Sequence, residues 1–139
     1  MAMETFQVHI LAADKNFYEG PCVSLTISTT DGELGILAHH SNMIAAIQPG
    51  ILRYQVPGEE PCLAAISPGM VKVEHNDVLV LVDAVERPEE IDAARAQREA
   101  DEAREILLQK RSRQEYKIAE AAMARALNRL RVKSTGVIR

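Results

Sequence analysis

The first part of the chain carries the hydrophobic pattern of β-strands. Val23, Leu25 and Ile27 alternate with hydroxyl-bearing residues, and this period of two marks a strand with one buried face. Asp31 and Gly32 then supply a tight turn. Further apolar runs follow at residues 44–47, 51–56, 62–66, 70–73 and 78–82, and residues typical of turns lie between them. Many short strands at this spacing predict an all-β fold, an antiparallel sandwich or barrel.

The last of these runs, from Val78 to Val82, is apolar at every position. A strand that is buried on both faces has this pattern, whereas a strand with one solvated face alternates. We therefore expect this strand to lie inside a sheet and not at its edge.

Beyond residue 89 the apolar spacing lengthens to three and four residues, which is the helical period. The two apolar stripes are Ala93, Ala96, Ala100, Ala103 and Leu107, followed by Tyr116, Ala119, Met123, Ala126 and Leu130. Residues 110–114 contain no apolar side chain, so they predict the turn of an antiparallel helical hairpin. Because the alanine-rich seam buries mostly methyl groups, worth about 0.8 kcal/mol per CH₂, we expect a hairpin that opens easily or packs on a partner.

A change in composition separates the two patterns. All six prolines and six of the seven glycines lie at or before Pro88, whereas residues 89–139 contain ten alanines and no proline. Residues that favour turns thus stop where residues that favour helices begin. The sequence predicts two modules, a β-sandwich domain over residues 1–87 and a two-helix hairpin over residues 88–139.

Charge is distributed unevenly along the chain. The net charge of −4 combines −7 over residues 1–87, −4 over residues 88–105 and +7 over residues 106–139. Phosphate backbones bind cationic surfaces and base stacking needs aromatic side chains, so this acidic chain with five aromatic residues is not expected to bind nucleic acid. The second helix is basic, and it presents either a solvated face or a docking surface for an acidic partner.

No pattern in the sequence indicates catalysis. His39, His40 and His75 suggest a cupin-like metal site, but adjacent residues on a strand point to opposite faces and no His-x-His spacing occurs. Cys22 and Cys62 lack a CxxC partner and are interpreted as small buried hydrophobic residues. The low cysteine count and a start without the pattern of a signal peptide favour a reduced cytosolic compartment. We therefore expect neither an enzyme nor a metal site.

Four charged residues of the hairpin are spaced to meet at one place. Asp92 and Arg95 share a face of the first helix, and Arg125 and Arg129 share a face of the second. In an antiparallel hairpin the start of one helix lies near the end of the other. Three arginines with one carboxylate suit a polyphosphate that carries a sugar or a base. Ordinary interhelical salt bridges are the alternative.

Four segments of the chain together resemble one known family. They are GELGILAHHSNMIAAIQPG at residues 32–50, SPGMVKVEHNDVLVLVDAVER at 67–87, IDAARA at 91–96 and ALNRLRV at 126–132. Their order, their spacing and the length of the chain are similar to those of the epsilon subunit of bacterial F-type rotary ATP synthases. The resemblance spans almost the whole chain.

The resemblance implies a sandwich of about ten short antiparallel strands followed by an α-helical hairpin, in a non-catalytic subunit of the proton-translocating ATP synthase. In this family the sandwich attaches to the gamma subunit of the central stalk and to the polar loops of the c-ring, which couples rotation to the catalytic head. Glu33 and His40 match positions for which the family implies a c-ring contact. The implied location is peripheral, on the cytoplasmic side of the cell inner membrane or plasma membrane.

The hairpin is the regulatory part of this family. In its folded state it permits turnover, and in its extended state it inserts a basic helix among acidic surfaces of the catalytic alpha and beta subunits and blocks ATP hydrolysis. The residues of this chain that the resemblance implies in the inhibitory helix are Lys110, Arg111, Arg113, Lys117, Arg131 and Lys133.

Some members of the family bind ATP on the folded hairpin, and the matching residues here are Glu86, Ile91, Asp92, Arg95, Arg125 and Arg129. A further position, which holds a supporting arginine in the ATP-binding members, is Glu102 in this chain. Its carboxylate is expected to repel phosphates, so we expect ATP to be a weak regulatory ligand and no cofactor to be required. The alternatives are a free-standing ATP-sensing hairpin protein and a β-sandwich metal enzyme.

Overall fold

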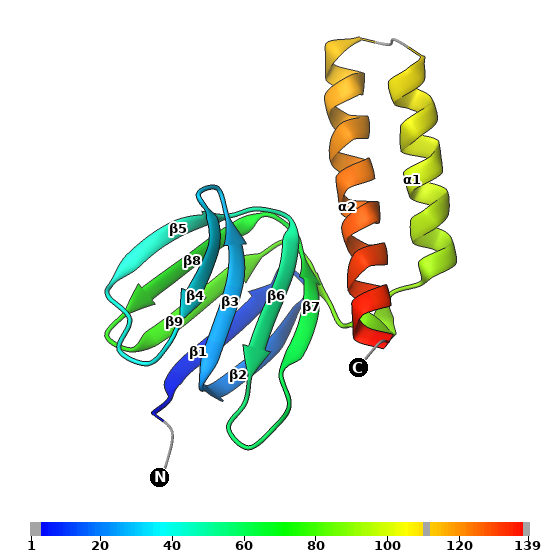
Figure 1. The fold of residues 1–139 in the computed structure, drawn as a ribbon. Helices are drawn as coiled ribbons and strands as arrows, with labels where there is room; N and C mark the ends of the chain where they lie inside the picture. The colour runs from blue at the N-terminus through cyan, green and yellow to red at the C-terminus, as the bar shows by residue number, and fades with distance from the viewer. Residues whose placement is uncertain (1–3, 110–111, 138–139) are drawn as a thin grey trace. The chain divides into compact units, whose positions relative to one another are not determined.

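The computed structural model describes residues 4–109 and 112–137 and forms two compact units, residues 1–86 and residues 87–139. We call them the strand unit and the helical unit (Figure 1). The strands are β1 (Phe6–Ala12), β2 (Lys15–Cys22), β3 (Ser24–Thr29), β4 (Gly32–Ile36), β5 (Met43–Ile47), β6 (Gly50–Gln55), β7 (Cys62–Ile66), β8 (Gly69–Glu74), β9 (Asp77–Val82) and β10 (Val85–Glu86).

The strand unit is a sandwich of two layers, which confirms the predicted fold class. The strands pair in the order β10-β7-β6-β3-β5-β8-β9-β1-β2, and β4 pairs with β3. Strands β3 and β5 share a single residue pair, Thr29 with Ile47, and there the sheet folds over into two layers (Figure 1). We call β5-β8-β9-β1-β2 the β9 layer, and β4-β3-β6-β7-β10 the β6 layer.

Strand β9 lies inside its layer, as its continuous apolar run predicts. It pairs with β8 in antiparallel and with β1 in parallel orientation. The parallel pair departs from the expected antiparallel pattern. Because β1 begins the unit and β9 comes near its end, no tight turn joins them and no hairpin dictates their direction. Val78, Val80 and Val82 are buried in the core, whereas the alternating residues Leu79 and Leu81 lie on the opposite face of the strand and are less buried.

The hairpin of β1 and β2 was not among the apolar runs that the sequence pattern indicated. In β1, Phe6, Val8 and Ile10 are buried and alternate with less buried residues, so the period of two was present. In β2 the pattern is interrupted, since the pairing with β1 shifts register between Ile10 and Leu11. Such a bulge changes which side chains face the core.

Gly69 stands where β8 and β9 approach closely. It pairs with Ile47 on one side and with Val82 on the other. A Cβ atom at residue 69 would overlap the carbonyl oxygen of Leu81 and lie 2.8 Å from the Cα of Val82. Gly35 on β4, by contrast, has nothing within 4 Å of the place that its Cβ would take. The β8–β9 ladder therefore requires glycine at residue 69.

The helical unit contains a short 3₁₀ helix, η1 (Pro88–Glu90), and two α-helices, α1 (Ala93–Leu108) and α2 (Arg113–Val137). Asp92 caps α1, because its Oδ1 accepts a hydrogen bond from the backbone N–H of Arg95 at 3.1 Å. The Oγ of Ser112 accepts from the backbone N–H of Glu115 at 3.3 Å. This contact starts α2 at Arg113, so the predicted turn over residues 110–114 is too long at its C-terminal end.

The predicted alanine seam of the hairpin is confirmed. Helices α1 and α2 lie side by side and antiparallel (Figure 1). The buried residues of the predicted stripes are Ala96, Ala100, Ala103, Ala119 and Ala126. Tyr116 and Ala93, at the ends of the stripes, are exposed. No described helix is long and apolar enough to cross a membrane.

The two cysteines differ in their surroundings, and this predicts different reactivity. Cys22 is fully buried, and this burial raises the pKa of its thiol to about 11, whereas Cys62 is only half-buried. A pKa raised from 9.0 to about 11 lowers the thiolate fraction at pH 8 about a hundredfold, and the thiolate is the reactive species. We expect the folded protein to show one fast thiol in a titration with Ellman's reagent and two after unfolding in urea.

Cys62→Ser is the control for this titration, since it should remove the fast thiol and leave the slow one. A fast reaction of the folded Cys62→Ser protein would contradict the buried position of Cys22.

Candidate functional site

The outer surface of the β9 layer carries a group of apolar side chains. In one row across four strands, Ala46 lies opposite Met70, Met70 opposite Leu81, and Leu81 opposite Leu11. Ile44 and Leu79 belong to the next row of the same surface, and the exposed fraction of Ile44 is 68%. We call these six residues the apolar face: Leu11, Ile44, Ala46, Met70, Leu79 and Leu81.

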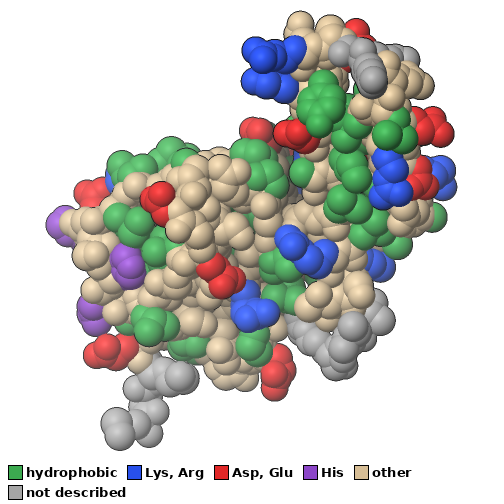
Figure 2. Space-filling model, turned by 45° about the horizontal axis from the view of Figure 1, so that its top comes forward, with side chains coloured by type: hydrophobic (Ala, Val, Ile, Leu, Met, Phe, Trp, Pro, Cys, Tyr) green, Lys and Arg blue, Asp and Glu red, His purple; other side chains and the backbone are tan. Residues whose placement is uncertain are grey.

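The outer surface of the β6 layer is polar along β3 and much of β6, although Ile51 on β6 and Leu63 and Ala65 on β7 belong to this surface too. Its β3 strand places Ser24, Thr26 and Ser28 outward, and the neighbouring β6 strand places Arg53 and Gln55 outward. A sheet that faces water on one side normally has this polar outer surface. The β9 layer instead has a row of four apolar side chains across its outer surface, and an exposed apolar patch marks an interaction site. Figure 2 shows hydrophobic side chains at the surface of both units.

Two polar side chains interrupt the second row of the apolar face. Lys72 on β8 lies opposite both Ile44 and Leu79, and His9 on β1 lies opposite Leu79. The Nε2 of His9 is 3.1 Å from Asp77 Oδ1, and the Nζ of Lys72 is 2.8 Å from an oxygen of Glu74. This second contact raises the pKa of Lys72 and lowers the pKa of Glu74. The first row is thus continuous in apolar side chains, whereas the second row mixes apolar and polar ones.

The two residues that match c-ring contacts of the family lie at opposite ends of β4. Glu33 follows the turn at the start of this five-residue strand and is exposed. His40 lies beyond the other end, where its Nδ1 is 2.9 Å from the carbonyl oxygen of Ser41. At about 3.3 Å per strand residue, the strand between them separates the two side chains, so they do not form one compact site.

The interpretation of His39 and His40 as strand residues is wrong. Both lie in the loop between β4 and β5, and His39 has a left-handed backbone with φ 65°. This conformation is held by the side chain of Asn76, whose Oδ1 accepts from the backbone N–H of His39 at 2.6 Å. Within residues 4–109 and 112–137, no three His, Cys, Asp or Glu side chains are grouped to hold a metal ion.

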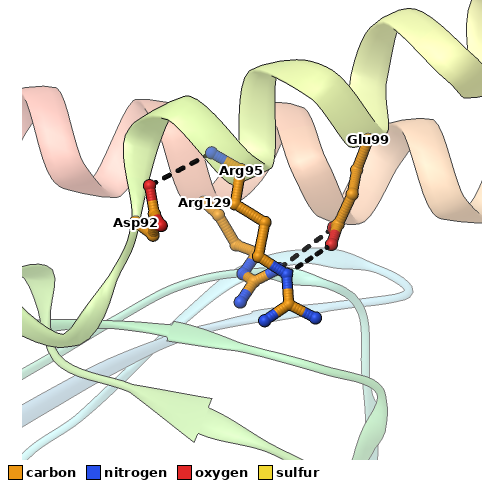
Figure 3. Close-up of polar contacts among 4 residues, drawn as sticks. All are labelled: Asp92, Arg95, Glu99 and Arg129. Atoms are coloured by element: carbon orange, nitrogen blue, oxygen red, sulfur yellow. Dashed lines mark hydrogen bonds and ion pairs between the residues drawn. The ribbon is translucent and has the colours of Figure 1, made fainter.

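The residues that match the ATP motif are joined to one another through a residue that the sequence did not single out. Glu99 on α1 accepts from Arg95 Nε at 3.1 Å through its Oε1, and from Arg129 Nη1 at 3.2 Å through its Oε2 (Figure 3). Asp92, the third member of the motif, is the N-cap of α1. The spacing of four residues between Arg95 and Glu99 was a signal for their contact. The contact of Arg129 with Glu99 joins two different helices, so no local spacing in the sequence indicated it.

The remaining motif residues have different surroundings. Ile91 is buried with an exposed fraction of 3%, and Glu86 belongs to β10 of the strand unit, where it pairs with Ala65. Arg125 lines a groove of about 490 Å³ between α1 and α2, together with the carboxylates of Glu99, Glu102 and Glu115.

The lining of this groove combines the carboxylates with the guanidinium of Arg125 and the apolar side chains of Ile106 and Ile118. Because the Glu99 carboxylate is paired with Arg95 and Arg129, Glu102 remains the residue that is expected to repel phosphate.

The basic residues of α2 fall into two groups. Arg113, Lys117 and Arg131 are exposed, and their spacings of four and fourteen place them on one face of the helix. Lys133 is half-buried and donates through Nζ to the carbonyl oxygen of Pro88 at 3.0 Å, so it serves the helical unit itself. Two other predicted members of the inhibitory helix, Lys110 and Arg111, lie outside the described residues.

These features define a class of protein, a two-module interaction protein with an apolar docking surface on a β-sandwich and a basic helical hairpin. The family models agree with this class. The model described as "ATP synthase, Delta/Epsilon chain, beta-sandwich domain" matches residues 5–88, and the model described as "ATP synthase, Delta/Epsilon chain, long alpha-helix domain" matches residues 89–134. The chain belongs to the ATP synthase delta/epsilon chain family.

Similar proteins carry the same description along their whole length. The ATP synthase epsilon chain of Caldanaerobacter subterraneus subsp. tengcongensis is 42% identical over 132 residues, which cover 94% of this chain and 95% of the relative. The ATP synthase epsilon chain of Neisseria meningitidis serogroup C is 35% identical over 138 residues, covering 99% and 97%. The family resemblance inferred from the four sequence segments is thus confirmed.

A solved structure shows the same fold. A chain in the structure of the OSCP/F1/c-ring part of the Euglena gracilis mitochondrial ATP synthase superposes with a TM-score of 0.81 at 23% identity, covering 97% of this chain and 82% of that chain.

Proposed function

We propose that this chain is the non-catalytic epsilon subunit of a rotary ATP synthase, which joins the gamma subunit of the central stalk to the c-ring and restrains ATP hydrolysis through its hairpin. The observation that carries this proposal is the apolar face of the β9 layer. An exposed group of apolar side chains on a sheet is typical of a surface that a partner covers, and the family resemblance implies that gamma is this partner.

The contact with the c-ring is proposed for the exposed Glu33 at the β3–β4 turn. His40, at the far end of β4, is proposed as a second contact with the c-ring, separate from that of Glu33. The subunit is proposed to be peripheral, on the cytoplasmic side of the cell inner or plasma membrane, held there by the complex. It needs no cofactor of its own.

The hairpin has the two properties that a mobile inhibitor requires. Its seam buries alanine methyl groups at Ala96, Ala100 and Ala103, so separating the helices exposes little apolar surface. Its second helix presents Arg113, Lys117 and Arg131 on one exposed face. We propose that this basic face docks on acidic surfaces of the catalytic alpha and beta subunits when the hairpin extends.

The double substitution Arg113→Ala and Lys117→Ala tests the inhibitory role. Each charged contact at the rim of an interface is worth about 0.5 kcal/mol, so we expect ATP hydrolysis by the assembled enzyme to rise severalfold while the subunit remains in the complex. Hydrolysis is measured on the purified complex after immunoblotting for the subunit.

The matched control is Arg98→Ala with Arg104→Ala, which removes two exposed cations from α1. Equal hydrolysis rates in both double variants and the natural enzyme would mean that the basic face of α2 is only solvated. A free-standing ATP-sensing hairpin protein, the rival function, would not be retained in the complex at all.

A further inference from the structure

We infer that Glu99 holds the hairpin shut by occupying the two arginines that an anionic ligand would otherwise bind. The three residues Arg95, Glu99 and Arg129 form what we call the latch. The latch belongs entirely to the helical unit.

The geometry of the latch gives each carboxylate oxygen its own arginine. Oε1 of Glu99 accepts from Arg95 Nε at 3.1 Å and Oε2 accepts from Arg129 Nη1 at 3.2 Å (Figure 3). The exposed fractions of the Glu99 and Arg129 side chains are 38% and 26%, so this pair is partly shielded from water. Charged hydrogen bonds with this shielding are stronger than those of fully exposed pairs.

Only one of the two hydrogen bonds of the latch is lost when the helices separate. Arg95 and Glu99 lie one turn apart on α1, so their contact survives opening and keeps the carboxylate oriented. Glu99 and Arg129 lie on different helices, so their contact exists only in the closed hairpin. This interhelical bond adds about 1 kcal/mol or less to the apolar packing of the hairpin, which buries five alanines of the seam and Val132.

The latch also competes with phosphate. A phosphate group bound by both Arg95 and Arg129 has to displace the Glu99 carboxylate from each of them. The hairpin of this chain therefore closes without nucleotide, and ATP binds it weakly because Glu99 already engages one N–H group of each arginine. The competition between Glu99 and phosphate rests on the proposed regulatory role of the hairpin, whereas the role of Glu99 in closing the hairpin does not.

Closure is measured on the isolated full-length chain with Glu99→Gln. Nitroxide labels are attached at Ala94→Cys and Thr135→Cys, two exposed positions near the base of the hairpin, in a Cys62→Ser background. Cys22 stays unlabelled because burial raises its thiol pKa to about 11. Pulsed EPR measures the distance between the two labels, which is short in the closed hairpin and long in the open one. A series of urea concentrations shifts the equilibrium between closed and open hairpins through its midpoint, so that the closed-to-open ratio can be compared between variants.

Glu99→Gln should lower the closed-to-open ratio about fivefold at equal urea. Glu102→Gln is the matched control, because Glu102 lines the same groove and is not a member of the latch, and it should leave the ratio unchanged. Arg129→Gln should lower the ratio as Glu99→Gln does, and the double variant should show no further decrease. Equal ratios for Glu99→Gln and Glu102→Gln, or additive effects of Glu99→Gln and Arg129→Gln, would overturn the latch.

Calorimetric titration with ATP tests the competition separately. Glu99→Gln should bind ATP several-fold more tightly than the natural chain. Unchanged affinity, or no binding in either protein, would overturn the competition with phosphate. Because both measurements use the isolated chain, their outcome does not depend on whether the assembled enzyme is inhibited by α2.

Discussion

Leu81→Glu is expected to weaken the binding of this chain to the gamma subunit by about a hundredfold or more. Leu81 lies in the four-strand row of the apolar face, between Met70 and Leu11, and 37% of its surface is exposed in the isolated chain. Because only 37% of Leu81 is left to cover, its burial by a partner contributes about 0.6 to 1.1 kcal/mol, and each 1.4 kcal/mol is a factor of ten in affinity. Most of the expected loss therefore comes from the desolvation cost of the introduced carboxylate in the interface. Surface plasmon resonance with immobilised gamma measures the loss.

Thr26→Glu is the matched control, since it introduces the same charge on the outer surface of the β6 layer. It should leave the affinity for gamma within a factor of two or three, and both variants should keep the circular dichroism spectrum of the natural chain. A natural chain that does not bind gamma would refute the proposed function. Equal losses in both variants would instead mean that gamma does not use the apolar face.

Gly69→Ala is expected to lower the free energy of unfolding of the strand unit by about 3 kcal/mol. The added methyl group meets the backbone of β9 at Leu81 and Val82, and a backbone cannot rotate away as a side chain can. Strands β8 and β9 must therefore move apart and lose hydrogen bonds. Urea unfolding followed by circular dichroism gives the change.

Gly35→Ala provides the comparison, because its added methyl group has open space. Its unfolding free energy should stay within about 0.5 kcal/mol of that of the natural chain. If Gly69→Ala were as stable as Gly35→Ala, the close approach of β8 and β9 would not exist in solution.

The elements of this fold were largely predictable because each has a local period. The alternation of Val23, Leu25 and Ile27 and the alanine spacing of the hairpin are properties of neighbouring residues. The register between elements is not local. Sequence spacing put Arg95 and Glu99 on one turn, but only the pairing of α1 with α2 brings Arg129 to the same carboxylate.

The apolar run at Val78–Val82 shows a second reason why sites are harder to predict than strands. Its pattern correctly placed β9 inside a sheet, and the natural inference was that both faces are covered by the chain itself. In the structure the valines face the core while Leu81 remains accessible. A hydrophobic pattern indicates that a strand face is buried, but burial in the core of the same chain and burial in an interface with a partner give the same pattern.

The alanine seam of the hairpin also has a thermal consequence. The heat-capacity change of a structural transition grows with the apolar area that it exposes, and parting helices packed through Ala96, Ala100, Ala103, Ala119 and Ala126 exposes little. The free energy of hairpin closure then varies almost linearly with temperature and has no optimum. The stability of the strand unit, with its large core of valine, leucine and isoleucine, follows a curved profile with a maximum. Warming therefore shifts the hairpin steadily toward its open form over a range in which the sandwich barely responds.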